Sequence, residues 1–299
     1  EAYSAVSDDA SAGYYNPAAL AFHDKNRRNL QFMHTNWLPK LADDMYYEYL
    51  GFSQYAEGWG HFAFNLVYFN QGEQARTSSI SSDIIGKFSS FELMASGSYG
   101  ATMTENFSLG LTFKAIYSKL ADAGQGNEKG KGVGNSFALD FGAMYKAPVK
   151  GLSLSAVVHN IGPKISYIDV SQADPLPLHA VFGASYIPIE SEFNKLTFAF
   201  DIYKPLVMRT GSPLEAIVKG WYDEDNEFEQ IDFKLGTEYV YNNFMALRAG
   251  YSYDKDGELK SPTFGVGILY EKLSVDIAYY AARDNPMQDS MRFSFAYDF

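Results

Sequence analysis

The C-terminal stretch, residues 291–299, reads Met-Arg-Phe-Ser-Phe-Ala-Tyr-Asp-Phe. A β-strand turns alternate side chains to opposite faces, so one face of this stretch would carry Phe293, Phe295, Tyr297 and Phe299. The other face would carry Arg292, Ser294, Ala296 and Asp298. The same alternation recurs along nearly the whole chain, with no second pattern that would supply the core of a soluble sandwich. Lipid outside a polar lumen explains it, and this is the pattern of a transmembrane β-barrel.

About fourteen segments alternate in this way, and many approach the ten residues that cross a membrane at a tilt. The predicted strands lie near residues 29–38, 44–55, 59–70, 89–101, 105–119, 135–147, 151–160, 178–188, 194–204, 229–241, 244–255, 260–271, 273–282 and 289–299. We therefore predict an all-β fold, a closed antiparallel transmembrane barrel of about fourteen strands. Residues 29–299 would form this barrel as one domain.

The connections between these segments alternate between long and short. The long ones include residues 77–88, 120–134, 161–177 and 205–228. The tight ones include residues 56–58, 102–104, 147–150, 190–192, 242–243 and 271–272. Outer-membrane barrels have long loops outside and short turns in the periplasm, and an even strand number puts both chain ends on the periplasmic side. Residues 214–220 would break this parity as a strand, so we predict a helix within a loop there.

Residues 1–28 do not alternate. They are rich in small residues and capping residues, and Pro17 suits the start of a helical turn. As a free tail this segment would expose several large side chains to water. We interpret it as a plug packed inside or under the barrel, with the plug residues Tyr14, Tyr15, Asn16 and Pro17. No signal peptide opens the chain, so we interpret it as a mature or trimmed sequence.

Composition agrees with an envelope barrel. The 299 residues carry a net charge of −12, which argues against nucleic acid as a partner, and contain no cysteine. Aromatic residues make up 16%, with 23 Tyr, 23 Phe and 3 Trp, and tyrosine suits the membrane–water interface. The mean hydropathy is −0.22, and no run approaches the roughly 20 apolar residues that a spanning helix needs. Both are expected of a barrel, because half of each strand faces the lumen.

The predicted lumen face carries charges of both signs. These are Glu48, Glu92, Lys114, Asp140, Lys146, Asp201, Asp232, Lys234, Glu238, Arg248, Asp276 and Arg292. A selective pore would show one dominant sign, so mixed signs favour ion pairs that brace the wall and the plug. A role in conduction is the alternative interpretation.

No pattern of catalytic or metal-binding residues stands out. The five histidines form no close-spaced ligand pair, so we expect no metal and no cofactor, although a bound lipid or detergent molecule is compatible with this fold. There is no nucleophile-elbow motif. We expect a protein that is not an enzyme; a barrel lipid enzyme would need a Ser–His pair near the membrane interface.

Apolar residues inside the predicted long loops are the candidate partner or cargo site. They are Trp37, Leu38, Leu41, Ile80, Ile84, Ile85, Ile165, Tyr167, Ile168, Val170, Leu206 and Met208. Loops in water have little reason to be so apolar, so these residues indicate a partner surface or the mouth of a hydrophobic-ligand site. The alternative is that the loops pack on one another and cap the barrel.

Several stretches resemble a known family. The segment Asp8-Asp9-Ala10-Ser11, followed by residues 16–20 (Asn-Pro-Ala-Ala-Leu), resembles the Asn-Pro-Ala signature of FadL-like barrels. The chain more specifically resembles the PorV family, or its PorV/PorQ-like relatives, in the type IX secretion system. The stretches that carry this resemblance are residues 160–167, 201–207, 235–239, 241–251, 264–267, 276–279, 285–287 and 292–294.

The resemblance implies a fourteen-stranded barrel of the bacterial outer membrane, without turnover, that serves protein secretion. It implies that extracellular loops bind the C-terminal signal domain of secreted cargo and pass the cargo from a large translocon barrel to a surface attachment complex. The chain departs from the family at residues 205–228, because members of the family usually carry a longer insertion in this connection. The alternative function is a FadL-like channel for hydrophobic small molecules, which needs an apolar route past the segment at 16–18.

Overall fold

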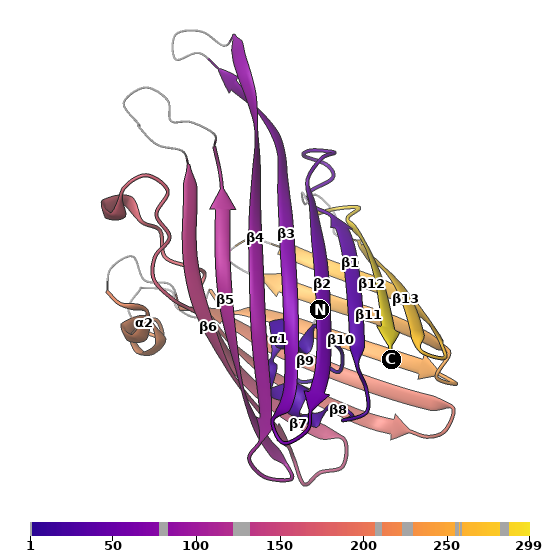
Figure 1. Ribbon diagram of the computed structural model, residues 1–299. Coiled ribbons are helices and arrows are strands. Elements are labelled where there is room, and N and C mark those ends of the chain that lie inside the picture. The colour runs from indigo at the N-terminus through magenta and orange to yellow at the C-terminus, as the bar shows by residue number, and fades with distance from the viewer. Residues whose placement is uncertain are drawn as a thin grey trace.

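The computed structural model describes residues 2–77, 83–121, 132–206, 211–222, 230–254, 257, 259–281 and 287–299. Fourteen antiparallel strands pair in chain order, and the first pairs with the last to close a barrel (Figure 1). The strands are β1 Asn29–Asn36, β2 Tyr46–Ala56, β3 Gly60–Thr77, β4 Ile84–Thr102, β5 Phe107–Lys119, β6 Val133–Lys146, β7 Leu152–Ile161, β8 His179–Glu190, β9 Asn194–Pro205, β10 Asp232–Tyr241, β11 Met245–Asp254, β12 Leu259–Tyr270, β13 Leu273–Tyr280 and β14 Met291–Asp298. The fold predicted from the alternation is confirmed.

Four short helices complete the described structure. They are α1 Ala12–Tyr15, η1 Pro17–Phe22, η2 Val170–Gln172 and α2 Pro213–Lys219. The helix predicted at 214–220 is therefore confirmed. Ser212 caps α2 and forms a reciprocal pair of hydrogen bonds with Glu215, which satisfies two free donors of the first turn. No helix in the described part of the chain is long and apolar enough to cross a membrane.

The predicted loop at 77–88 is wrong in part, because β4 already begins at Ile84. The register between β3 and β4 shifts between Asn70 and Glu73, and Gly72 there has a φ of +77°. Such a bulge interrupts the period of two on which the strand prediction depended. The two strands continue beyond it as a ribbon that rises above the neighbouring strands (Figure 1).

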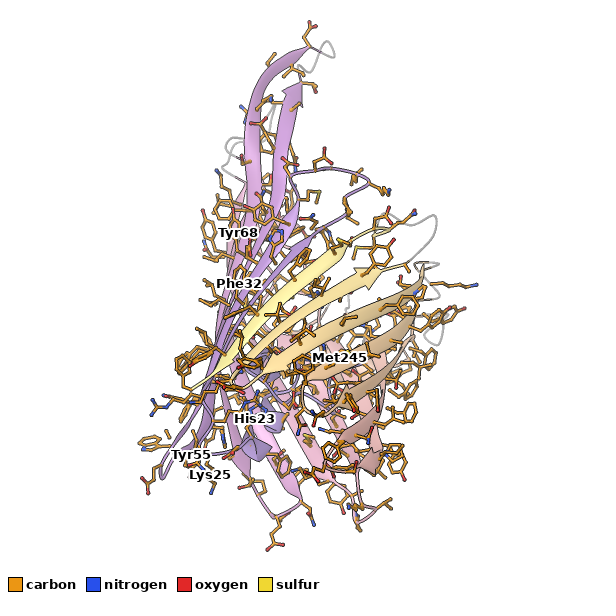
Figure 2. All side chains as sticks on the ribbon, turned by 90° about the vertical axis from the view of Figure 1, so that its right-hand side faces the viewer. His23, Lys25, Phe32, Tyr55, Tyr68 and Met245 are labelled. Carbon is orange, nitrogen blue, oxygen red and sulfur yellow. The ribbon has the colours of Figure 1, made fainter. Side chains whose placement is uncertain are left out.

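The register sets the two faces of the wall. Phe293 pairs with Ile277, and Ile277 with Val266, so the three lie side by side across β14, β13 and β12. All three are nearly half exposed, at 44%, 47% and 48%. This outer face would meet lipid. Figure 2 shows Phe32 and Tyr68 on the same outer side of the wall.

A row of aromatic rings crosses the outer face of β1 to β5, in the half of the wall toward the long connections. Neighbouring centroids are 5.7 to 6.2 Å apart along His34, Tyr46, Tyr68, Phe91 and Tyr117. Amphipathic rings gather where a barrel leaves the hydrocarbon, so this row marks the membrane boundary on that side.

The placement of Glu48 in the lumen was wrong. Glu48 pairs with His34, which in turn pairs with the outward-facing Phe293, and the His34 Nδ1 to Glu48 Oε1 distance is 2.9 Å. Both side chains are about one-third exposed, at the level of the aromatic row. Tyrosine fits either face of a barrel wall, so the run Tyr46-Tyr47-Glu48-Tyr49 did not define which residues point inward.

Candidate functional site

The lumen contains the N-terminal segment, residues 2–28, whose helices α1 and η1 lie inside the barrel (Figure 1). Small side chains let it pack tightly: Ala10, Ala12, Ala18, Ala19 and Leu20 are at most 1% exposed. Asn16 is fully buried and joins the two helices. Its Oδ1 accepts from the Ala18 amide at 3.0 Å, and its Nδ2 donates to the Ser4 carbonyl at 2.9 Å.

Three glycines in register form a flat cradle for this segment. Gly100 pairs with Gly110, and Gly110 with Gly142, on the adjacent strands β4, β5 and β6. A Cβ added at Gly100 or at Gly110 would lie 2.6 Å from the Pro17 carbonyl oxygen. Only residues without a side chain allow the backbone of the helix to approach this closely. Ser108 on the same wall donates to the Ala18 carbonyl at 2.8 Å.

The start of the chain is held by Asp201 on β9. One carboxylate oxygen accepts from the Tyr3 amide at 2.8 Å and the Ser4 amide at 3.1 Å, and the other accepts from the Ser4 hydroxyl at 2.6 Å. Asp201 is 5% exposed. Hydrogen bonds to a buried carboxylate are the strong class, so this residue fastens residues nearly two hundred positions away in the sequence.

The tyrosines of the segment lie against each other. Tyr15 contacts Tyr3 and Tyr14 edge to face, at centroid distances of 5.0 and 5.1 Å. Tyr14 is 38% exposed, and Lys114 Nζ lies 5.7 Å from the centre of its ring. The segment therefore presents an aromatic surface to a charged patch on the wall.

That patch is built on a bulge in β7. Leu139 pairs with Ile161 and Phe141 with Val158, so β7 contains one extra residue there, and Asn160 adopts a φ of +63°. The bulge brings consecutive residues to one carboxylate. Asp140 accepts from the Asn160 amide at 2.8 Å and lies 3.0 Å from His159 Nδ1.

Lys114 completes the patch, with its Nζ 2.7 Å from Asp140 and 2.8 Å from the Asn160 side-chain oxygen. Lys114 is 5% exposed and Asp140 is fully buried. The ring of His159 stacks on His179 at 4.8 Å, and His179 stacks on Tyr203 at 4.3 Å. Sequence reasoning placed Lys114 and Asp140 on the lumen face, but missed His159 because a bulge has no clear alternation signal.

Other lumen charges also pair. Arg248 on β11 donates to Glu238 on β10 at 2.6 Å and to Asp276 on β13. Lys146 Nζ lies 4.1 Å from the ring centre of Phe22, at the end of η1. These contacts agree with charges that brace the wall and the segment inside it.

His23 follows η1, at the end of the barrel where the tight turns lie. Figure 2 shows it inside the wall, above Lys25 and Tyr55. Its Nε2 donates to the Ser7 carbonyl at 3.2 Å. Burial lowers the pKa of His23 to about 4.

Several candidate partner residues pack inside the protein. Ile165, 6% exposed, clusters with Ala138 and Leu176, and the Tyr167 hydroxyl donates to Ser118 at 3.1 Å. Because Ala138 and Ser118 face the lumen, this part of the connection covers the mouth. Leu206 is 1% exposed beneath α2.

Other candidates lie near the mouth or on the surface. Trp37 contacts the rings of Tyr47 and Phe69, at 5.0 and 6.2 Å, and Leu38 beside it is partly buried with a φ of +48°. The exposed candidates are Leu41 at 70%, Ile84 at 64%, Ile85 at 62%, Ile168 at 44% and Val170 at 83%. Ile80 and Met208 lie outside the described residues. The exposed set comes from two connections and from the start of β4, all at the end of the barrel with the long loops.

Comparison with solved structures agrees with this architecture. The toluene transporter TodX of Pseudomonas putida matches with a TM-score of 0.58 and 14% identity over 99% of this chain and 94% of that chain. The toluene transporter TbuX of Ralstonia pickettii matches with a TM-score of 0.56 and 14% identity, covering 97% and 93%. At this identity the likeness concerns the fold. The chain is a transmembrane β-barrel with the fold of these transporters.

A family model described as type IX secretion system protein PorV matches residues 1–212. The match covers more than two-thirds of the chain, and the chain belongs to this family. The stretches after residue 212 that also suggested the family lie outside the match. No curated protein matches this chain.

Proposed function

We propose that this protein binds secreted cargo of the type IX system through its extracellular loops and passes it from the translocon barrel to the surface attachment complex. The ligand would be the C-terminal signal domain of the cargo. Membership of the PorV family supports a role in secretion rather than an enzymatic one, and the proposal needs no cofactor.

The observation that carries the proposal is the combination of a filled lumen with exposed apolar loops. Residues 1–28 would act as a plug, held by the glycine cradle and by Asp201. Meanwhile Leu41, Ile85 and Val170 are 70%, 62% and 83% exposed at the end with the long connections. Long connections lie outside the cell in this class of barrel. Exposed apolar side chains on loops that a rigid wall holds in place suit recognition of another protein.

The test is copurification of cargo with the barrel from outer membranes in mild detergent. Serine would replace Ile84 and Ile85 in one variant, and Ile168 and Val170 in another. Interface anchors cost more than about 2 kcal/mol each when truncated, so cargo recovery should fall by at least about tenfold. Val149→Ser is the matched control, because Val149 is 57% exposed at the opposite end of the barrel. Full recovery of cargo by both double variants would refute the loop assignment.

A channel for hydrophobic small molecules is the second candidate, and the likeness to TodX and TbuX favours it. Such a channel needs an apolar route past residues 16–18. Asp140, Lys114 and Asp201 are buried on the lumen side near this segment, which supports the cargo-binding proposal over the channel. The test is the uptake of a hydrophobic dye into vesicles that contain this barrel and no other protein. An uptake rate that rises in proportion to the number of barrels per vesicle would instead support the channel.

A further inference from the structure

The connection that contains α2 lies against the outside of the barrel. Ala216 of α2 packs with Leu178, Ala180 and Leu206, and Ile217 packs against the same cluster. Ala180 pairs with Val158, and Val158 with Phe141, which is 50% exposed on the outer wall. The cluster is therefore on the face that would meet lipid, and Figure 1 shows α2 outside the strands.

The opposite face of α2 is also apolar. Leu214 and Val218 are 70% and 62% exposed and lie four residues apart, on one side of the helix. Trp221 and Tyr222 continue that side just after the helix, at 41% and 67% exposure. A helix with apolar residues on two opposite sides is covered on both of them. The barrel wall covers only the side with Ala216 and Ile217.

Several polar groups of this segment are already paired. The Trp221 indole N–H donates to the Ile217 carbonyl at 2.8 Å, so the ring would bring no unpaired donor into an apolar environment. Glu215 and Lys219 lie 3.7 Å apart and are about half exposed, which leaves their charges directed to water. The Gly220 amide donates to the Ala216 carbonyl at 2.9 Å and closes the helix.

The level of the segment can be taken from β8. The Trp221 ring lies 5.9 Å from that of Phe182, which is on the outer face and eight residues from Glu190, the end of β8 at the tight turns. At about 3.3 Å per residue and a tilt of about 40°, this places Phe182 roughly 20 Å from that end. The apolar band of such barrels is about 25 Å tall. Trp221 therefore lies near the outer boundary of the hydrocarbon.

We propose that residues 211–222 form an outer-leaflet anchor, in which α2 lies between the barrel wall and the acyl chains with Leu214, Val218 and Trp221 in the lipid. The occupant is lipid because this face continues the lipid-facing wall, and because the side chains of tryptophan and tyrosine suit the membrane interface. The anchor is independent of cargo binding, since it uses none of the exposed loop residues assigned to cargo.

Quenching of tryptophan fluorescence by bromine tests the anchor. The full chain with Trp37→Phe and Trp59→Phe retains Trp221 alone and would be placed in vesicles of phosphatidylcholine brominated near the glycerol end of its chains. We expect Trp221 to lose more than half of its emission relative to unbrominated vesicles. A protein that keeps only Trp37 is the matched control, because Trp37 packs on the lumen-facing rings of Tyr47 and Phe69 and should not be quenched.

A second variant distinguishes the contribution of the helix from that of the barrel wall. Serine in place of both Leu214 and Val218 should weaken the quenching of Trp221, while the barrel keeps its compact migration on unheated gels. If Trp221 is not quenched in the protein that keeps Trp221 alone, the proposal is overturned. If Trp221 becomes shielded from water only after outer-membrane extract is added, its partner is a protein and not lipid. Unchanged quenching in the serine variant would also overturn it, because the wall alone would then hold Trp221.

Discussion

Replacement of Gly110 by alanine tests most directly how the wall holds the N-terminal segment in the lumen. The new Cβ would lie 2.6 Å from the Pro17 carbonyl oxygen and closer still to the Ala18 amide nitrogen. Both are backbone atoms of a segment fixed on either side, by Asn16 and by the fully buried Leu20. The segment must therefore move away from the wall. Overpacking of this kind costs about 1–3 kcal/mol.

Hydrogen exchange of the η1 amides measures that cost directly. A loss of about 1–3 kcal/mol in the stability of this local unit corresponds to a rise in exchange of about 5- to 150-fold. The strand amides of β12 and β13, far from the cradle in the wall, should keep their protection. A loss spread evenly over the barrel would mean that the segment is not a separate unit.

Gly97→Ala is the matched control for this experiment. Gly97 lies within β4, the neighbour of the strand that carries Gly110, but on the outer face, where an added Cβ would first meet the Phe64 ring at 3.8 Å, an ordinary contact. It should leave exchange in η1 unchanged. Equal exchange in the Gly110 and Gly97 variants would refute the reasoning that the cradle holds the segment.

Three further predictions follow from named contacts. Asp201→Asn removes a charge that accepts three hydrogen bonds from Tyr3 and Ser4, so it should cost about 1–3 kcal/mol and make residues 2–7 sensitive to protease; continued protection would contradict that role. Asp140→Ala leaves Lys114 buried and uncompensated, which should cost about 3–5 kcal/mol in urea unfolding, and added Lys114→Met should recover most of it. Burial lowers the pKa of His23 to about 4, so as pH falls the undocked segment binds a proton before the docked one does. Docking of the segment should therefore be complete above pH ~6.5 and weaken as pH falls toward 4. His23→Gln should remove this pH dependence from the hydrogen exchange of the η1 amides.

Much of the barrel could be predicted because the same alternation of apolar and polar residues recurs in every strand. Every strand must bury one face in lipid, so alternation in stretches such as Phe293-Ser294-Phe295 indicates strand, face and length at once. The connections added an independent test, because their parity required residues 214–220 to be something other than a strand. The prediction failed where this rhythm is interrupted, at the bulge around Gly72 and at the ambiguous run of tyrosines around Glu48.

The interior arrangement depends on distant residues meeting in space. No local pattern joins Gly100, Gly110 and Gly142, which are unremarkable in sequence and become a cradle only in register. His159 and Asn160 likewise gain their roles from a bulge that brings both to Asp140. The exposure of the loop residues could not be predicted from the sequence either. Ile165 and Val170 are equally apolar, but they are 6% and 83% exposed.

Site-specific photo-crosslinking in cells tests the central claim most directly. A photoreactive residue at Val170, which is 83% exposed at the end with the long connections, would be compared with one at Met103, 52% exposed at the opposite end. The account predicts adducts with secreted proteins at position 170 and none at position 103. Cargo adducts at 103 alone, or at neither position while secretion continues, would contradict recognition by the extracellular loops.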